Sequence, residues 1–173
     1  DLAIVAARTG GPGAKGISLF MVEKDKAPGF KVNKVLEKMG QHGLDTCEVF
    51  LDDVRVPAAN LLGGVEGNGF GKMMDSFVKE RITIAVTAIA SAERAIELTL
   101  DYVKQRKMFG QTLWDFQNTK FKLAECVSLA RIGRVFIDNL IDRLVRGENS
   151  PSAEEAAMAK VWCSEQQWKI VDE

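Results

Sequence analysis

The chain has 173 residues, and its 23 Lys and Arg residues nearly balance 24 Asp and Glu residues, giving a net charge of −1. With 46% hydrophobic and 27% charged residues, it has an ordinary globular composition, which excludes a disordered or collagen-like chain. Neither part of the chain is a polycation, so nucleic acid and anionic membranes are poor partners. The longest uncharged stretch of the helical part, 82–92, is too short to span a bilayer.

Up to about residue 57 the sequence has the short period of strands. Apolar residues run through 2–5 and 16–22, whereas 30–35 and 47–51 alternate apolar with polar residues. Gly- and Pro-containing turn signals separate these runs. The pattern predicts half-buried strands of a mostly antiparallel sheet. The chain opens in such a run with no Met and no signal-peptide pattern, so we expect a piece of a longer protein.

Five glycines mark a boundary before the period becomes helical: Gly63, Gly64, Gly67, Gly69 and Gly71. We therefore predict a strand domain over 1–60, a hinge over 61–71 and a helical domain over 72–173. A phosphate-binding loop is the weaker interpretation. Glu66 stands where a Walker A loop needs glycine, Met73 stands where it needs Ser or Thr, and no G-x-G-x-x-G is present.

Three helices are predicted after this boundary. In the first, apolar residues recur every three or four positions until Gly110, which we expect to end it. The second ends at Gly147 and has a seven-residue stripe, which favours packing against another long helix; the stripe consists of Phe116, Leu123, Ala130, Ile137 and Leu144. The third begins with Ser152 in a capping box, or with Ser150 as the cap.

Ordinary catalytic and metal-binding patterns are weak in this chain. His42 is the only histidine, which excludes a His-rich metal site and leaves any Ser-His-Asp triad dependent on one loop residue. The three cysteines, Cys47, Cys126 and Cys163, form no C-x-x-C pair, which favours a reducing compartment. We expect Cys126 and Cys163 to be packing residues, and we predict no metal site.

One carboxylate interrupts a largely apolar stripe of the first helix. By helical spacing, the stripe consists of Met73, Phe77, Glu80, Ile84 and Ser91. Two interpretations stay open. Glu80 is either bent to the surface or paired with Lys79 or Arg81, or it is a proton-abstracting base on an apolar wall.

A second unusual segment, 105–110, joins a cationic cluster to an aromatic residue and a glycine. Basic residues at this place can simply complement the helix dipole. Alternatively, Arg106, Phe109 and Gln117 converge at a corner between two helices. Arginine suits phosphate, an aromatic side chain suits a flat ring and an amide suits a base edge, so this corner would suit a dinucleotide.

At these residues the chain resembles the acyl-CoA dehydrogenases, and most closely the long-chain and isovaleryl-type subgroup. The resemblance covers nearly the whole chain. It rests on the sequence segments GISLFMVE, LDDVRVPAANLLGG, KERITIA and YVKQRKMFGQTLWDFQ. The combination of LDDVRVP, a glycine-rich hinge, R-K-x-F-G and a following F-Q is highly specific.

The resemblance implies an α+β fold, in which the end of an antiparallel β-barrel domain precedes an incomplete up-down helical bundle. The 1–60 segment would be the second part of the barrel, and 72–173 the first three helices of a domain that builds a homotetramer. It further implies an FAD enzyme of fatty acid β-oxidation, in the bacterial cytoplasm or the mitochondrial matrix. Such enzymes remove an α-proton and transfer a β-hydride to the flavin, giving a trans-2-enoyl-CoA, and an electron-transferring flavoprotein takes the electrons.

The resemblance also assigns site residues. The subgroup carries its base in the text E-R followed by L or I, which here is Glu80-Arg81-Ile82. It therefore favours Glu80 as the catalytic base and Arg81 as a substrate-binding residue at the acyl-CoA site. Arg106 matches a residue that contacts the pyrophosphate of a neighbouring subunit's FAD. Gln117 matches a residue that lies toward the adenosine of that FAD, and Phe109 matches a residue that packs at the flavin.

Two residues depart from the family pattern: Val78 replaces an Asp that meets CoA in some relatives, and Met108 replaces a hydroxyl residue near the pyrophosphate. An acyl-CoA oxidase or a related flavoenzyme of the same fold is the first alternative. A non-catalytic helical oligomerisation module is the second. The 173 residues by themselves are expected to be inactive.

Overall fold

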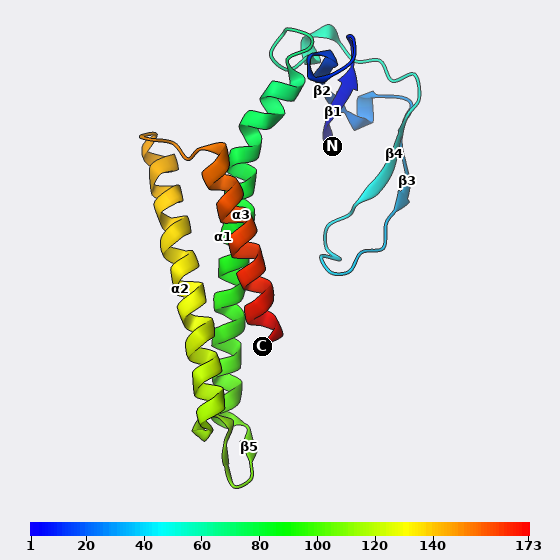
Figure 1. Cartoon of the computed structure of the whole chain (residues 1–173). Coiled ribbons are helices and arrows are strands. Elements are labelled where there is room, and N and C mark those ends of the chain that lie inside the picture. Colours follow the sequence, from blue (N-terminus) through cyan, green and yellow to red (C-terminus); the bar gives the residue numbers. More distant parts are fainter. The chain divides into compact units, whose positions relative to one another are not determined.

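Strands occupy the first part of the chain and three long helices the second (Figure 1). The structure, a computed structural model, describes residues 1–173 and contains two compact units, Asp1–Met74 and Asp75–Glu173. The expected α+β class is confirmed. None of the helices combines the length and the apolar character that crossing a bilayer requires.

Two antiparallel strand pairs build the first unit. β1 (Leu2–Arg8) pairs with β2 (Ile17–Glu23), and β3 (Phe30–Val35) pairs with β4 (Cys47–Leu51). The strands lie where the apolar pattern predicts them, but they form separate two-stranded sheets. β3 and β4 are also mostly exposed, which differs from the predicted half-buried strands. Val35, Val49 and Phe50 are 45–57% exposed, so no second layer covers these apolar residues.

Short 3-10 helices follow β1, β2 and β4, at Ala14–Gly16, Lys24–Lys26 and Ala58–Asn60. The buried Ser18 hydroxyl lies 2.6 Å from the Thr9 hydroxyl and accepts the Gly67 amide at 2.9 Å. It thereby fastens the glycine-rich segment to β2. Gly69 packs so closely on the Ser18 backbone that a Cβ would lie 2.8 Å from the Ser18 carbonyl carbon.

α1 (Gly69–Gln105) is the longest element, with 37 residues. It begins inside the predicted 61–71 hinge and ends five residues before Gly110. The predicted helix stop at Gly110 is therefore wrong. That glycine lies instead in a small hairpin of β5 (Lys107–Met108) and β6 (Gln111–Thr112), which is followed by the 3-10 helix η4 (Leu113–Asp115).

The second unit buries one face of each long helix. α2 (Gln117–Arg146) and α3 (Ala153–Asp172) pack with α1 around two clusters of small and aliphatic side chains. The clusters consist of Ile82, Ala85, Ala88, Ile89, Ile137, Leu140, Ala156, Ala159 and Cys163, and of Ala92, Ile96, Cys126, Ala130 and Ile170. Ile137 and Ala130 of the seven-residue stripe lie in these clusters, so the predicted packing of the stripe against another long helix is confirmed. Burial raises the pKa of the Cys126 and Cys163 thiols, which suits packing residues.

The helix ends follow local rules. Gly147 closes α2 in the left-handed region, with φ 69°. Ser152 is the N-cap of α3: its hydroxyl accepts the Glu155 amide at 3.2 Å, and the Glu155 carboxylate accepts the Ser152 amide at 2.8 Å. The capping box, rather than the Ser150 cap, is therefore formed.

Candidate functional site

Glu80 lies on α1, on the side facing away from the core residues Ile82, Ala85 and Ile89. Its side chain is exposed. The ion pairs made by α1 are Arg94–Glu97 and Glu93–Arg134, so Glu80 has no ionic partner. The pairing with Lys79 or Arg81 that sequence reasoning left open is therefore not formed. The exposed carboxylate agrees with the surface position that was the other part of that interpretation, and from there it is free to meet a ligand.

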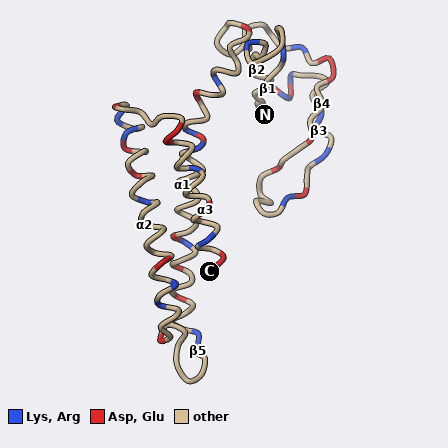
Figure 2. Tube along the Cα trace, in the orientation of Figure 1, with Lys and Arg blue, Asp and Glu red and all other residues tan.

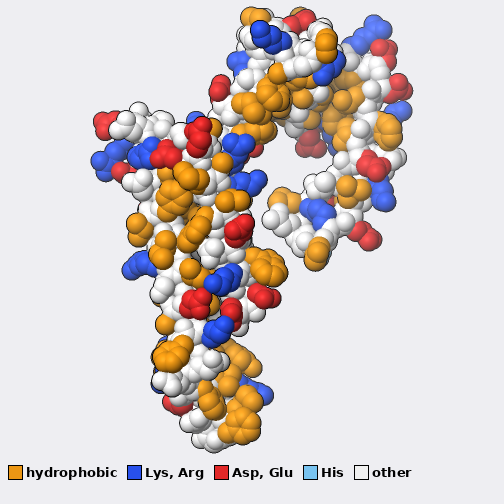
Figure 3. Space-filling model, in the orientation of Figure 1, with side chains coloured by type: hydrophobic (Ala, Val, Ile, Leu, Met, Phe, Trp, Pro, Cys, Tyr) orange, Lys and Arg blue, Asp and Glu red, His pale blue; other side chains and the backbone are white.

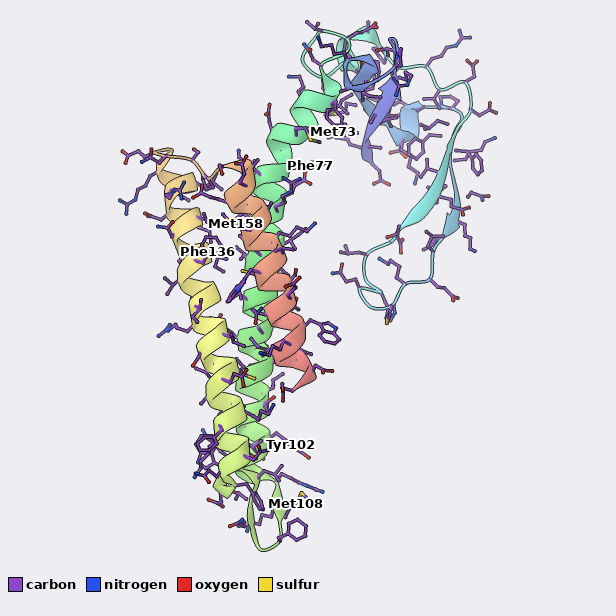
Figure 4. All side chains as sticks on the ribbon, viewed as in Figure 1. Met73, Phe77, Tyr102, Met108, Phe136 and Met158 are labelled. Carbon is purple, nitrogen blue, oxygen red and sulfur yellow. The ribbon has the colours of Figure 1, made fainter.

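Arg81 is half-buried, and its guanidinium carbon lies 5.9 Å from the centre of the Phe77 ring, within the range of a cation–π contact. Figure 4 labels Phe77 on the first half of α1. Phe77 and Ile84 lie three and four positions from Glu80, so this face presents a carboxylate between two apolar side chains. A carboxylate, a fixed arginine and an apolar surface form the first half-site.

The second half-site is the connection between α1 and α2. Arg106 is anchored through its backbone on both sides: its amide donates to the Tyr102 carbonyl at 2.9 Å, and its carbonyl accepts the Leu113 amide at 2.8 Å. Its guanidinium is exposed and takes part in none of the ion pairs of the helical unit. Such a guanidinium offers its full set of donors to an anion.

Phe109 and Gln117 belong to the same connection. Phe109 is 90% exposed and has φ 54°, and Gly110 follows with φ 83°, so the pair forms the tip of the hairpin. Gln117 is the exposed first residue of α2. The structure thus brings the three predicted residues onto one short connection. Figure 2 shows basic residues at this end of the bundle with acidic residues among them. The donor set fits a dinucleotide with phosphates and a flat ring.

Sequence reasoning missed the residues that hold this connection in place. The Asp115 carboxylate accepts from the Thr112 hydroxyl at 2.6 Å and from the Thr112 amide at 2.9 Å, and these bonds lower the pKa of Asp115. The half-buried Trp114 ring lies 5.9 Å from the Lys104 ammonium and 5.8 Å from the Lys120 ammonium. The Thr-x-x-Asp spacing was a readable signal. The Trp114 contacts were not, because they join two helices.

The two half-sites are far apart within one chain. α1 rises about 1.5 Å per residue, so Glu80 and the end of α1 at Gln105 are separated by roughly 38 Å along the helix axis. A single dinucleotide cannot place its reactive ring at one end and its phosphates at the other. The structure therefore places Glu80 beside Arg81 on α1, and Arg106, Phe109 and Gln117 on or next to the α1–α2 connection, and it separates the two groups.

Comparison with known families agrees with this order of strands and helices. The family described as acyl-CoA dehydrogenase, C-terminal domain, matches residues 67–173, and the family described as acyl-CoA dehydrogenase, middle domain, matches 1–54. The chain belongs to the acyl-CoA dehydrogenase family, as the resemblance indicated.

Individual relatives agree. The mitochondrial long-chain specific acyl-CoA dehydrogenase of Rattus norvegicus is 43% identical over 96% of this chain and 39% of its own length. A probable acyl-CoA dehydrogenase of Mycobacterium abscessus is 38% identical, with a TM-score of 0.92 over 99% of this chain and 45% of its own. A structure described as the electron transferring flavoprotein of Acidaminococcus fermentans contains a chain with a TM-score of 0.91 and 34% identity, over 98% of this chain and 44% of that one. The chain therefore spans about two fifths of the length of its relatives.

Proposed function

We propose that the whole protein is a flavin-dependent acyl-CoA dehydrogenase. It oxidises the Cα–Cβ bond of an acyl-CoA thioester to the trans-2-enoyl-CoA. The observation that carries this proposal is Glu80: an exposed carboxylate without an ionic partner, between apolar side chains, in the E-R-I text of a member of the acyl-CoA dehydrogenase family. A base must be reachable and must not be neutralised by a neighbouring cation, and Glu80 meets both requirements.

In this proposal Glu80 accepts the α-proton of the substrate. Arg81, steadied by the Phe77 ring, contributes positive charge at the acyl-CoA site, where negative charge develops as the α-proton leaves. Arg106 would bind the cofactor pyrophosphate, Phe109 would contact the flavin and Gln117 would lie toward the adenosine. Bound FAD would supply the acceptor for the β-hydride.

The separation of the half-sites supports an active site shared between protomers. Since Glu80 and the α1–α2 connection lie roughly 38 Å apart along one helix, the connection of one protomer would serve the cofactor of another. We infer a homo-oligomer, most simply the homotetramer of the family. Residues 1–60 would complete part of a β-barrel, 61–71 would link it to the bundle, and 72–173 would supply three of its helices.

The likeness to the rat enzyme supports a fatty acyl-CoA substrate, and the likeness to a chain in the A. fermentans structure supports an electron-transferring flavoprotein as the acceptor. The similar proteins include a mitochondrial enzyme of the rat and a bacterial enzyme of Bacillus subtilis, so the bacterial cytoplasm or the mitochondrial matrix is the proposed location.

The test uses the whole protein, purified and mixed anaerobically with saturated acyl-CoA thioesters. Stoichiometric FAD and rapid loss of its absorbance at about 450 nm are expected. A protein that binds no FAD would contradict the proposal and favour a helical oligomerisation module. Rapid reoxidation of the reduced flavin by O2, without an electron-transferring flavoprotein, would assign an oxidase instead.

A further inference from the structure

Trp114 bridges the two helices that meet at the proposed cofactor half-site. Lys104 lies in the last turn of α1 and Lys120 in the first turn of α2, and both ammonium groups lie within 6 Å of the indole centre, at 5.9 and 5.8 Å. Neither lysine belongs to any of the ion pairs of the helical unit. One half-buried indole therefore joins two cations from different helices.

The same turn is joined directly to Arg106. Leu113, the neighbour of Trp114, donates its amide to the Arg106 carbonyl at 2.8 Å. Asp115, on the other side of Trp114, accepts two hydrogen bonds from Thr112 at the end of the hairpin. Fixing the indole between the two lysines consequently fixes the backbone that carries Arg106.

An aromatic ring suits this position better than a carboxylate would. A carboxylate would attract both lysines but would also cancel positive charge beside Arg106. The face of an indole attracts ammonium groups through its quadrupole and carries no net charge. Trp114 can therefore hold Lys104 and Lys120 together without adding a second negative charge to that of Asp115, whose pKa Lys120 helps to lower.

We propose that Trp114 is a positioning residue, whose clamp on Lys104 and Lys120 holds Arg106 in the geometry that binds the phosphates of the dinucleotide. This rests on the proposed function. A connection whose backbone is held at Arg106 before binding loses less conformational entropy when the phosphate arrives, so the clamp contributes to affinity without touching the ligand.

The test measures FAD affinity by adding FAD to the apoprotein of the whole protein and following flavin fluorescence. Trp114→Ala should raise the apparent Kd about tenfold, the magnitude of two exposed cation–π contacts. Trp114→Phe, which retains an aromatic face, should restore most of the affinity. Trp168→Ala, which removes a 72% exposed indole from α3, should leave it unchanged. The bleaching rate per bound flavin should be the same in Trp168→Ala as in the wild type.

A double-mutant cycle separates positioning from general stability. In an Arg106→Ala background, Trp114→Ala should raise the apparent Kd for FAD by less than about twofold, because Arg106, the residue through which Trp114 acts, is gone. Two independent losses that multiply would overturn the proposal. A Trp114→Phe variant as weak as Trp114→Ala would also overturn it.

Amide hydrogen exchange gives a readout that needs no cofactor. In Trp114→Ala the Leu113 amide, bonded to Arg106, should exchange faster than in the wild type, and in Trp168→Ala it should not. Unchanged exchange in Trp114→Ala would overturn the clamp. A wild-type protein that binds no FAD but shows this exchange pattern would overturn the proposed function and leave the clamp supported as a conformational device.

Discussion

Phe109 is held in a backbone conformation that a bulky side chain disfavours. Its φ of 54° and the φ of 83° at Gly110 place both residues in the left-handed region, as in the two-residue hairpin turns that favour Asn-Gly. Such a conformation costs on the order of 1–3 kcal/mol. The ring is 90% exposed, so packing does not offset that cost. An unfavourable residue at this tip is consistent with a binding role.

We therefore expect Phe109→Asn to trade binding for stability. Asparagine tolerates the left-handed region, so the free energy of unfolding of the 173-residue chain should rise by up to about 1 kcal/mol. FAD affinity of the whole protein should fall, because an aromatic contact is lost. Chemical denaturation and FAD titration measure the two effects.

Phe121→Asn is the matched control, because it removes an exposed Phe from within α2, where no left-handed strain exists. It should lower stability slightly, since Asn is a poorer residue inside a helix. If Phe109→Asn destabilises the chain as much as Phe121→Asn does, the strain argument fails.

The candidate residues show what a sequence reveals at this scale. Five candidate residues could be predicted because each belongs to a recognisable sequence motif; they are Glu80, Arg81, Arg106, Phe109 and Gln117. Trp114 could not. Its contacts depend on where the hairpin places the ends of α1 and α2, and no spacing along the chain encodes that placement.

At the scale of elements, close packing of α2 against α1 and α3 depends on Gly133. A Cβ at this position would lie 2.3 Å from Ile89 Cδ1 and 3.1 Å from the Trp162 ring. Ile89 is completely buried and has little space to move. Gly133→Ala should therefore destabilise the chain by about 1–3 kcal/mol in denaturant unfolding, despite the better helix propensity of alanine.

Gly71→Ala is the control for that prediction. Gly71 lies in α1 with open space around it, so alanine should stabilise the chain by up to about 1 kcal/mol. Effects of the same sign at both positions would mean that propensity, rather than packing, decides the result.

The junction of α2 and α3 makes stability depend on pH. Arg143 donates to both Glu155 carboxylate oxygens, at 2.6 and 2.9 Å. These bonds, together with the Ser152 amide, lower the pKa of Glu155 from 4.5 to about 2. A folded pKa below the unfolded value means that the stabilisation is fully present above pH 4.5 and is lost as the pH falls toward 2.

Thermal unfolding over this acidic range should show a steep loss of stability in the wild type. Glu155→Gln should lower Tm at neutral pH and make the dependence on pH less steep, because one of the titrating carboxylates is gone. Glu165→Gln, at an exposed position of the same helix, should leave the wild-type slope intact. An unchanged slope in Glu155→Gln would rule out this ion pair as its cause.

Hydrophobic period predicted the elements well, because the strand and helix patterns differ sharply on either side of the glycine-rich segment. Two features were not predictable. The alternation in β3 and β4 indicates strands but not what covers them. The hairpin after α1 lacks the usual Asn-Gly signal, so Gly110 resembled a helix stop although the chain leaves the helix five residues earlier.

At the scale of the whole chain, the helical unit exposes apolar surface. A groove of about 390 Å³ runs between α2 and α3, and its lining residues are Ile132, Phe136, Met158, Val161 and Trp162. Figure 3 shows hydrophobic side chains gathered over these helices, and Figure 4 labels Phe136 and Met158. Continuous apolar surface of this kind favours association.

We expect the 173-residue chain to self-associate at tens of micromolar in light scattering. Val161→Glu, within the groove, should shift the population toward monomer. Leu98→Glu, at an exposed position of α1 outside the groove, should have a smaller effect. A stable wild-type monomer at these concentrations would contradict the prediction.

Glu80 is proposed as the base of an acyl-CoA dehydrogenase, and anaerobic flavin bleaching of the Glu80→Gln whole protein is the decisive experiment. Glutamine is nearly isosteric, so fold and FAD content should be retained, as in the control Glu97→Gln on the same helix. An amide cannot accept the α-proton. The bleaching rate with saturated acyl-CoA should therefore fall by about three orders of magnitude or more in Glu80→Gln and stay near wild type in Glu97→Gln. Bleaching of Glu80→Gln within a few-fold of the wild type would show that Glu80 is not the base.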